Sequence, residues 1–184
     1  MHYFNSTDIL FNTKAIIDSN LELDIYIPEK KLAIEFDGLY WHSTYLRKDK
    51  NYHLTKTKLC EKQGIQLVHI FENEWLYSRQ IVKSRLKSLF GIYDKIIYAR
   101  KCSIKEIDNE ISRNFLDENH IQGKINSKIN IGLYLENELV SLMTFSKPRF
   151  SKKYEYEMIR FCSKINYNVI GAAGKMLKYF EKTY

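Results

Sequence analysis

The sequence predicts a protein of mixed α and β structure (α/β or α+β), and three observations predict it. Hydrophobic residues make up 45% of the 184 residues, which is enough to bury a core. Segments in which apolar and polar residues alternate, as in half-buried strands, are interspersed with segments of helical periodicity. Only two prolines and seven glycines interrupt these segments, without a low-complexity linker or an internal repeat.

The first half of the chain is expected to hold three strands and two helices, after an opening stretch of weak pattern. Two alternating segments and one short apolar run predict the strands, which are 23–27, 32–36 and 65–71. Helical periodicity predicts the two helices, which are 50–63 and 74–90. Gly64 is the stop signal of the first helix.

The second half is expected to hold four strands and two helices. The expected strands are 95–100, 129–136, 138–146 and 154–162. The middle two form a hairpin around Asn137. Ser103 and Glu106 have the spacing of a capping box, which predicts a helix from there to about Asn119. An amphipathic segment predicts the last helix, 171–182.

A soft domain boundary is expected near 94–100, after Gly91 closes the preceding helix. The two expected domains are therefore residues 1–95 and 96–184. The first carries two more basic than acidic side chains and the second carries five more. The net charge of +7 and the pI of about 9.1 favour a polyanionic partner such as nucleic acid.

Composition excludes several classes of protein. No run of apolar residues is long enough for a membrane span, and the N-terminus lacks the pattern of a secretory signal. The three cysteines, Cys60, Cys102 and Cys162, are odd in number and far apart. This spacing argues against a structural zinc site and against a disulfide framework, so we expect a reducing cytoplasm.

The most informative segment is a hairpin rich in carboxylates. Only one register keeps the apolar side chains on one face of the hairpin and the acidic side chains on the other. In this register the residue numbers of each directly paired couple add up to 59. Asp24 then lies opposite Glu35, and Glu22 opposite Asp37, with all four acids on one face. Because like charges at this distance repel, folding alone gains nothing from them, and Mg²⁺ would relieve the repulsion. The alternative is a solvated polar face on an edge hairpin.

Histidines and a lysine follow the hairpin. His42 comes five residues after Asp37, where it could act as a general base or hold a water. His53 and Lys56 share one face of the expected helix, and a lysine there could stabilise phosphate charge. A packed histidine and a solvated helix face are the structural alternatives. His69 lies in an apolar strand and is interpreted as a packed core histidine.

Two segments, LELDIYIPEKKLAIEFDGLYWHS and YHLTKTKLCEKQGIQLVHIFENEW, resemble the Vsr-like branch of the PD-(D/E)XK nucleases. Within that branch they are most similar to the phage homing endonucleases of the EDxHD group. The resemblance covers about residues 20–90. It implies a mixed sheet flanked by helices and a Mg²⁺-dependent phosphodiesterase that acts on double-stranded DNA. It also implies a phage-encoded protein in the cytoplasm of a bacterial host.

The resemblance transfers roles to positions of this chain. The matched catalytic residues are Asp24, Glu35, Asp37, His42, His53 and Lys56. The matched metal ligands are Asp24, Glu35 and Asp37. The chain departs from the family at Asp37, which stands where the usual acid-x-Lys pattern has lysine. It also lacks a clear helix with a glutamate before the first strand, for which Asp8 or Asp18 would be weak substitutes.

Residues 98–184 resemble a module that often follows such nucleases, with part of an acyltransferase-like (GNAT-type) fold. This gives a Vsr-like, restriction-endonuclease-type core followed by a small, incomplete α+β module. In the GNAT-type fold a glycine turn at a helix N-terminus holds the pyrophosphate of coenzyme A. The segment 171–175, GAAGK, fits that turn loosely, and plain packing of a helix start is the favoured interpretation.

The function expected from these features is metal-assisted hydrolysis of a DNA phosphodiester. DNA contacts are expected from a stretch that interleaves basic and aromatic residues, through Lys147, Arg149, Lys152 and Lys153. A basic loop between strands is the alternative there. A homodimer is compatible with such an enzyme. Competing functions are a catalytically impaired DNA-binding remnant, a Vsr-type mismatch repair nickase and an acyl-CoA transferase.

Overall fold

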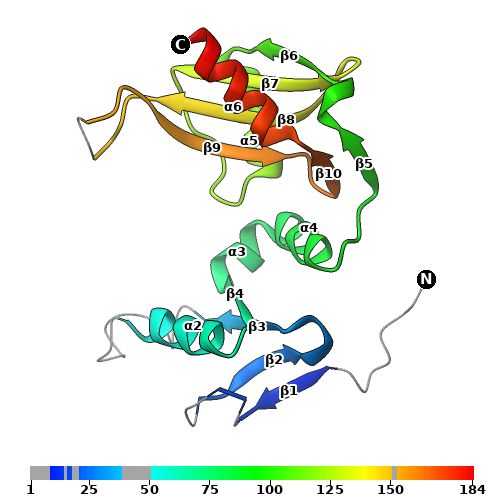
Figure 1. Ribbon diagram of the computed structural model, residues 1–184, viewed down its shortest axis with the longest axis vertical. Coiled ribbons are helices and arrows are strands. Elements are labelled where there is room, and N and C mark those ends of the chain that lie inside the picture. The colour runs from blue at the N-terminus through cyan, green and yellow to red at the C-terminus, as the bar shows by residue number, and fades with distance from the viewer. Residues whose placement is uncertain (1–8, 15, 18–20, 39–50, 151–152) are drawn as a thin grey trace. The chain divides into compact units, whose positions relative to one another are not determined.

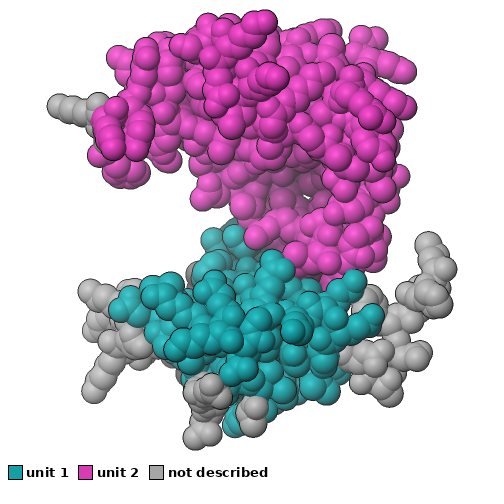
Figure 2. All heavy atoms as spheres, in the orientation of Figure 1, with its two compact units in different colours: residues 1–77 teal, residues 78–184 magenta. Residues whose placement is uncertain are grey.

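Three β-sheets and five α-helices make up the described part of the chain (Figure 1). The computed structural model describes residues 9–14, 16–17, 21–38, 51–150 and 153–184. The protein is therefore of mixed α and β structure, as the sequence predicts. It divides into two compact units, residues 1–77 and 78–184 (Figure 2). This division lies inside the expected helix 74–90, whereas the sequence suggests a boundary after that helix, near 94–100.

The first unit contains one mixed four-stranded sheet. Its strands are β1 (Leu10–Thr13), β2 (Leu23–Ile27), β3 (Leu32–Asp37) and β4 (Gln66–Phe71), in that order across the sheet. Strands β1, β2 and β3 are antiparallel neighbours, and β4 is parallel to β3. The helices are α2 (Tyr52–Lys62), which connects β3 to β4, and the short α3 (Glu72–Tyr77). A helical crossover of this kind is the usual connection between parallel strands.

The β2–β3 hairpin has the predicted register. Ile27 pairs with Leu32, and Ile25 with Ile34, so that paired positions sum to 59. A 3₁₀ turn, Pro28–Lys30, connects the strands, and Lys31 closes it with φ 47° and an N–H bond to the Pro28 carbonyl. Proline at the start of such a turn costs no hydrogen bond, because its missing N–H would have no partner there.

Strand β3 has β2 and β4 on its two edges, and α2 packs over one of its faces. Ala33 is fully buried and shares a core cluster with Cys60 of α2. Glu35 and Asp37, on the same face as Ala33, are only 5% and 1% exposed. The interpretation of this face as a solvated edge is therefore wrong for these two acids. Phe36, on the opposite face and expected in its apolar row, is 47% exposed.

Helix α2 ends as the sequence predicts. Gly64 adopts the left-handed conformation with φ 70°, and its N–H bonds to the Glu61 carbonyl. The next N–H, of Ile65, bonds to the Cys60 carbonyl. A residue without a Cβ is favoured at such a helix end. The chain then enters β4 directly.

The second unit is built on a four-stranded antiparallel sheet and a two-stranded parallel sheet. The first has the order β6 (Ser103–Glu106), β7 (Ile129–Leu135), β8 (Glu138–Ser146) and β9 (Glu157–Ser163). The second pairs β5 (Lys95–Tyr98) with β10 (Tyr167–Ile170). The helices are α4 (Arg79–Leu89), α5 (Asn109–Asn119) and α6 (Ala172–Thr183). A further 3₁₀ turn, Ala99–Lys101, follows β5.

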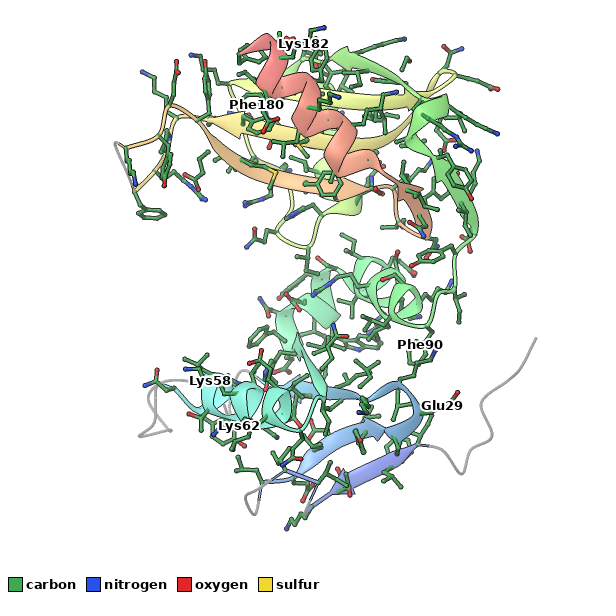
Figure 3. All side chains as sticks on the ribbon, viewed as in Figure 1. Glu29, Lys58, Lys62, Phe90, Phe180 and Lys182 are labelled. Atoms are coloured by element: carbon green, nitrogen blue, oxygen red, sulfur yellow. The ribbon has the colours of Figure 1, made fainter. Side chains whose placement is uncertain are left out.

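Two helices cover opposite faces of the antiparallel sheet. Phe180 lies on α6 (Figure 3), and with Met176 it shares a core with one set of alternate strand residues. Its ring stacks on that of Phe145, with ring centroids 3.7 Å apart. Phe115 and Leu116 of α5 pack with Leu142 from the other set. Successive side chains of a strand point to opposite faces, so this division follows from the alternation in the sequence.

The predicted capping box is wrong. The segment Ser103–Glu106 is strand β6, which pairs with β7, and α5 begins later. Its N-cap is Asp108, whose Oδ1 accepts a hydrogen bond of 2.9 Å from the Ile111 N–H. Pairing with a strand distant in the sequence outweighs the local capping preference here.

Other differences concern strand and helix ends. The expected helix 74–90 is two helices, α3 and α4, separated at Ser78, whose φ of −129° and ψ of 33° depart from helical values. The strand expected at 154–162 begins only at Glu157. The short strands β1 and β10 are absent from the sequence prediction. Among the described residues, no helix combines the length and apolar character needed to cross a bilayer.

All three cysteines are free, with Cys60 and Cys102 buried and Cys162 half-buried. Burial raises the pKa of each thiol, and that of Cys162 to about 12. Because the thiolate is the reactive form, we expect the folded protein to react slowly with a thiol-specific reagent at pH 8. A colorimetric thiol titration should count three fast-reacting groups only after unfolding in guanidinium. A thiol that reacts in the folded protein as fast as free cysteine would contradict this.

Candidate functional site

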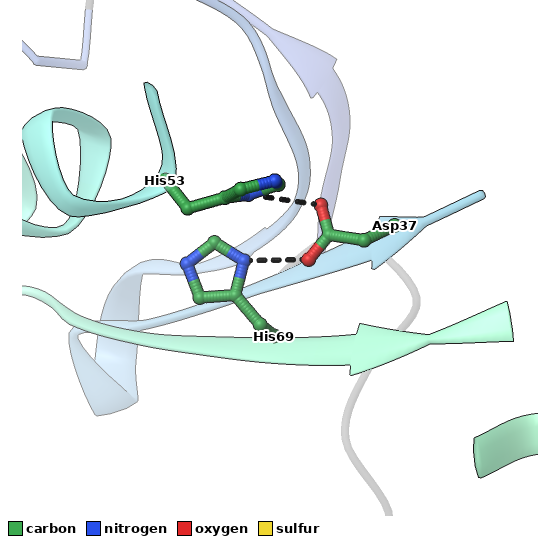
Figure 4. Close-up of side chains that lie close together, drawn as sticks. All are labelled: Asp37, His53 and His69. Atoms are coloured by element: carbon green, nitrogen blue, oxygen red, sulfur yellow. Dashed lines mark hydrogen bonds and ion pairs between the residues drawn. The ribbon is translucent and has the colours of Figure 1, made fainter. Parts of the chain in front are cut away.

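Asp37, His53 and His69 converge at one end of the mixed sheet (Figure 4). Asp37 is the last residue of β3, His69 lies in the neighbouring strand β4, and His53 lies in the first turn of α2. The parallel register pairs Asp37 with Phe71, so the site lies at the carboxyl ends of the two strands. In open sheets with parallel strands, ligands commonly bind at this edge.

The Asp37 carboxylate contacts both histidines. Its Oδ2 lies 2.7 Å from Nδ1 of His69, and its Oδ1 lies 3.5 Å from Nδ1 of His53. The Asp37 side chain is 1% exposed, whereas those of His53 and His69 are 33% and 18% exposed. The carboxylate is therefore buried behind two imidazoles that solvent can reach.

Thr57 completes the surroundings of the histidines. Its hydroxyl donates a hydrogen bond of 2.8 Å to the His53 carbonyl one turn earlier in α2. The same oxygen lies 3.2 Å from Nε2 of His69. The ring of Phe71 stacks on that of His69 with centroids 6.4 Å apart. Both nitrogens of His69 thus have polar neighbours, as the interpretation of a packed histidine requires, although the ring is only partly buried.

Glu35 and Lys56 form a buried ion pair next to this group. Glu35 lies two residues before Asp37, and Lys56 lies one turn after His53. The Lys56 ammonium is 2.5 Å from Oε2 of Glu35, and both side chains are almost fully buried, at 3% and 6% exposed. The other carboxylate oxygen accepts a hydrogen bond of 3.1 Å from the Asp24 N–H. Burial raises the pKa of Glu35, and the hydrogen bond from Lys56 opposes the rise.

The remaining predicted acids have other partners. Oδ2 of Asp24 accepts a hydrogen bond of 2.8 Å from the Phe36 N–H, so this carboxylate binds the backbone of β3. Glu22 lies 3.6 Å from the Lys14 ammonium, and its side chain is 40% exposed. Asp24 and Glu35 are neighbours, as expected, and the contact between them is the hydrogen bond from the Asp24 N–H to the Glu35 carboxylate.

The predicted Mg²⁺ site can be tested against these contacts. Mg²⁺ prefers oxygen ligands in near-octahedral geometry. Of the expected ligands, Asp24 binds a backbone N–H, Glu35 binds an ammonium, and Asp37 faces two imidazoles. Among the described residues, the one group of three or more His, Cys, Asp or Glu side chains with mutually close ligand atoms is Asp37, His53 and His69. Its single carboxylate and two imidazoles do not match the preference of Mg²⁺.

The structure therefore brings together five sequence-predicted residues in one region of the first unit, which are Asp24, Glu35, Asp37, His53 and Lys56. His42 lies outside the described residues. His69 was missed as a site residue. The sequence does contain a signal for His69, which is a polar residue within the otherwise apolar strand β4. Because a helix connects β3 to β4, the two strands must run parallel. That arrangement pairs His69 with Glu35 and places it on the face with the acids.

The predicted DNA-binding residues lie around the end of the β8–β9 hairpin in the second unit. Arg149 forms an ion pair of 2.7 Å with Glu157, which raises the pKa of the guanidinium and lowers that of the carboxyl. Lys153 lies over the Tyr154 ring at 5.5 Å, and Lys147 is exposed. Lys152 lies outside the described residues. The basic and aromatic side chains are thus adjacent, and Phe150 is 93% exposed.

The glycine turn before α6 lies next to the turn after β5. Gly171 has φ 81° and directly follows β10. The Lys175 ammonium donates to the carbonyls of Ala99 and Cys102, at 2.9 and 2.5 Å. These contacts connect α6 to the turn after β5.

Comparison of the chain with models of protein families gives no match, and comparisons with curated proteins and with solved structures give no significant match.

Replacing Lys56 with Met should destabilise the protein in a pH-dependent way. The substitution leaves Glu35 buried without its cation, which costs about 3–5 kcal/mol. The pKa of Glu35 in the folded state then rises further above its unfolded value. The proton on Glu35 then contributes to the free energy of unfolding. This contribution is fully present below the pKa that Glu35 has in the unfolded state. It is lost, by about 1.4 kcal/mol per pH unit, as the pH rises from that value towards the pKa of Glu35 in the folded state. Urea unfolding should show a larger loss at pH 8 than at pH 5.

The matched control is the double variant Lys56→Met with Glu35→Gln, which has no buried charge at this position. Its loss of stability relative to the native chain should not grow between pH 5 and pH 8. An equal loss at both pH values in the single variant would mean that Glu35 is not the group responsible.

Proposed function

We propose that this chain is a metal-dependent DNA endonuclease of the Vsr-like PD-(D/E)XK type, of the kind found in phage homing endonucleases. It would hydrolyse phosphodiester bonds of double-stranded DNA in the cytoplasm of a bacterial host. The observation that carries the proposal is the convergence of Asp37, His53 and His69 beside the buried Glu35–Lys56 pair. All five residues lie in the two segments that resemble these nucleases.

The proposal assigns the two units different tasks. The mixed sheet and α2 of the first unit would be the Vsr-like catalytic core. The second unit has nine more basic than acidic side chains, whereas the first has two fewer, so the second unit would be the partial GNAT-like module and would add DNA contacts. Mg²⁺ is the ion that the resemblance implies, and any metal would lower the pKa of a bound water and neutralise phosphate charge.

The side chains have distinct roles in this proposal. Hydrolysis requires a water oxygen to attack phosphorus while the bond to the leaving oxygen breaks, and a group must accept the proton of the water. His42 is the group expected from the sequence to take that role, whereas His53, with its partly exposed ring next to Asp37, belongs to the group that would hold the metal. Lys56 is 2% exposed and contacts Glu35, so it would position α2 rather than contact phosphate directly.

A DNA-binding remnant without catalytic activity is the second candidate, and one observation favours it. The Asp24 and Glu35 carboxylates, expected as metal ligands, already accept hydrogen bonds from Phe36 and Lys56. A protein with this arrangement could retain DNA affinity while having lost the metal ligands that cleavage needs.

Cleavage of supercoiled plasmid separates the two candidates. We expect nicking or linearisation with Mg²⁺ or Mn²⁺, and none in EDTA. The variants Asp37→Asn and His53→Gln should reduce the rate by about 10²–10⁴-fold, the range for loss of an acid–base group. Glu61→Gln, which changes an exposed acid on the same helix, is the matched control and should leave the rate unchanged. Undiminished cleavage by Asp37→Asn would refute the site, and DNA binding without cleavage would favour the remnant.

Salt dependence tests the predicted DNA contacts. Each phosphate contact contributes a slope of roughly 0.9 to the fall of log K with log salt concentration. The triple variant Arg149→Ala, Lys152→Ala, Lys153→Ala should therefore bind duplex DNA more weakly and with a shallower slope, measured by fluorescence anisotropy. Lys124→Ala, Lys178→Ala, Lys182→Ala removes the same charge from other elements of the second unit and serves as the control. Equal slopes for the two variants would argue against the predicted contacts.

A further inference from the structure

We propose that Asp37, His53 and His69 bind a divalent transition metal ion such as Zn²⁺ or Co²⁺ in preference to Mg²⁺, with Thr57 orienting His69. The inference deepens the proposed function, because the ion would serve the same site. It depends on the donor atoms, their distances and the hydrogen bonds around them, each of which is independent of the nuclease resemblance.

The contacts of Thr57 fit a hydrogen on Nε2 of His69, which is the tautomer that a metal bound at Nδ1 requires. A hydroxyl has one hydrogen, and that of Thr57 is donated to the His53 carbonyl. If Thr57 donates to His53 in this way, the contact of 3.2 Å between Thr57 Oγ1 and His69 Nε2 has its hydrogen on Nε2. In the neutral ring Nδ1 then bears a lone pair, and this nitrogen lies 2.7 Å from Oδ2 of Asp37. Two lone pairs so close repel each other unless a cation lies between them.

A metal ion is such a cation, and the other two ligand atoms are nearby. The ligand atoms of Asp37, His53 and His69 all lie within 4.8 Å of one another. Zinc bonds to imidazole nitrogen and carboxylate oxygen are about 2.0–2.2 Å long, which places neighbouring ligands of a tetrahedron roughly 3.4 Å apart. The observed separations of 2.7 and 3.5 Å from Asp37 are thus within an ångström of that geometry.

The arrangement also has the features of a catalytic rather than a closed site. Three protein ligands with an open fourth position are typical of catalytic zinc, and two histidines with one carboxylate are a common set. Asp37 is buried, whereas the imidazoles are partly exposed, so one side of the group faces solvent. The ligands come from β3, α2 and β4, which the sheet and its crossover helix hold in place.

The donor set determines the preference among ions. Imidazole favours zinc, copper, iron and nickel, whereas Mg²⁺ favours carboxylates, carbonyls and water. In other metal sites, a histidine ligand commonly donates its second N–H to an oxygen, and loss of that partner costs about 10–100-fold in affinity. Thr57 is such a partner for His69.

The test is metal binding by the full chain after EDTA treatment and dialysis. Isothermal titration should give one equivalent of bound Zn²⁺ and no comparable heat with Mg²⁺. Co²⁺ should produce the visible absorption of a four- or five-coordinate ion without a thiolate charge-transfer band, which excludes the three cysteines as ligands. Asp37→Asn and His69→Gln should abolish binding, and His120→Gln in the second unit should not affect it.

Thr57 provides the sharper comparison. Thr57→Val keeps the shape but removes the oxygen, and should weaken Zn²⁺ binding by about 10–100-fold. Thr57→Ser retains the hydroxyl and should bind as the native chain does, with circular dichroism confirming that both variants fold. If Zn²⁺ and Co²⁺ fail to bind, or bind equally to His69→Gln, the cation between Nδ1 and Asp37 is a proton and the proposal is wrong. Metal binding without plasmid cleavage would refute the nuclease alone, and Mg²⁺-dependent cleavage without Zn²⁺ binding would refute the metal preference alone.

Discussion

The alignment of helix α2 along one face of strand β3 is the constraint on which the first unit depends. Alternate residues of the strand, Ala33, Glu35 and Asp37, meet residues of successive turns of the helix, which are Cys60, Lys56 and His53. The chemistry of these partners changes along the strand, from apolar contact through a buried ion pair to the histidine group. A two-residue period in the strand and a period of about 3.6 in the helix together produce this sequence of contacts. The apolar contact between Ala33 and Cys60 stabilises the position of α2 on the sheet, and the contact between Asp37 and His53 at the other end forms the site.

The parallel strand β4 completes this arrangement. Its register places His69 on the face of Glu35 and Asp37, so that a third element contributes to the group. A buried ion pair is weak evidence of added stability, since desolvation offsets much of the attraction between its charges. The Glu35–Lys56 pair is better understood as a determinant of how α2 docks. Glu35 binds Lys56 with one oxygen and the Asp24 N–H of β2 with the other, and so joins the helix to a second strand.

Features that depend on local pattern were predictable, and features that depend on distant pairing were not. Alternation in the β2–β3 hairpin allowed one register without mixing its faces, and that register is observed. Gly64 marked the end of α2 for a similarly local reason. The capping box at Ser103 failed because β6 is held by β7, which lies beyond α5 in the chain. The sequence alone favours a packed core histidine at His69, because its partners, Asp37 and Thr57, come from other elements.

The spacing of the contact residues along α2 determines which side of the helix faces β3, as well as where along the strand the site lies. Each residue of an α-helix is rotated by about 100° from its neighbour. His53, Lys56 and Cys60 lie on one side of α2 because they are three and four residues apart, and Gly64 fixes where the helix ends. One residue inserted between Cys60 and Lys56 would leave Cys60 and β4 anchored while turning His53 and Lys56 away from β3. The length of this helix segment is therefore as much a part of the site as the side chains that it carries.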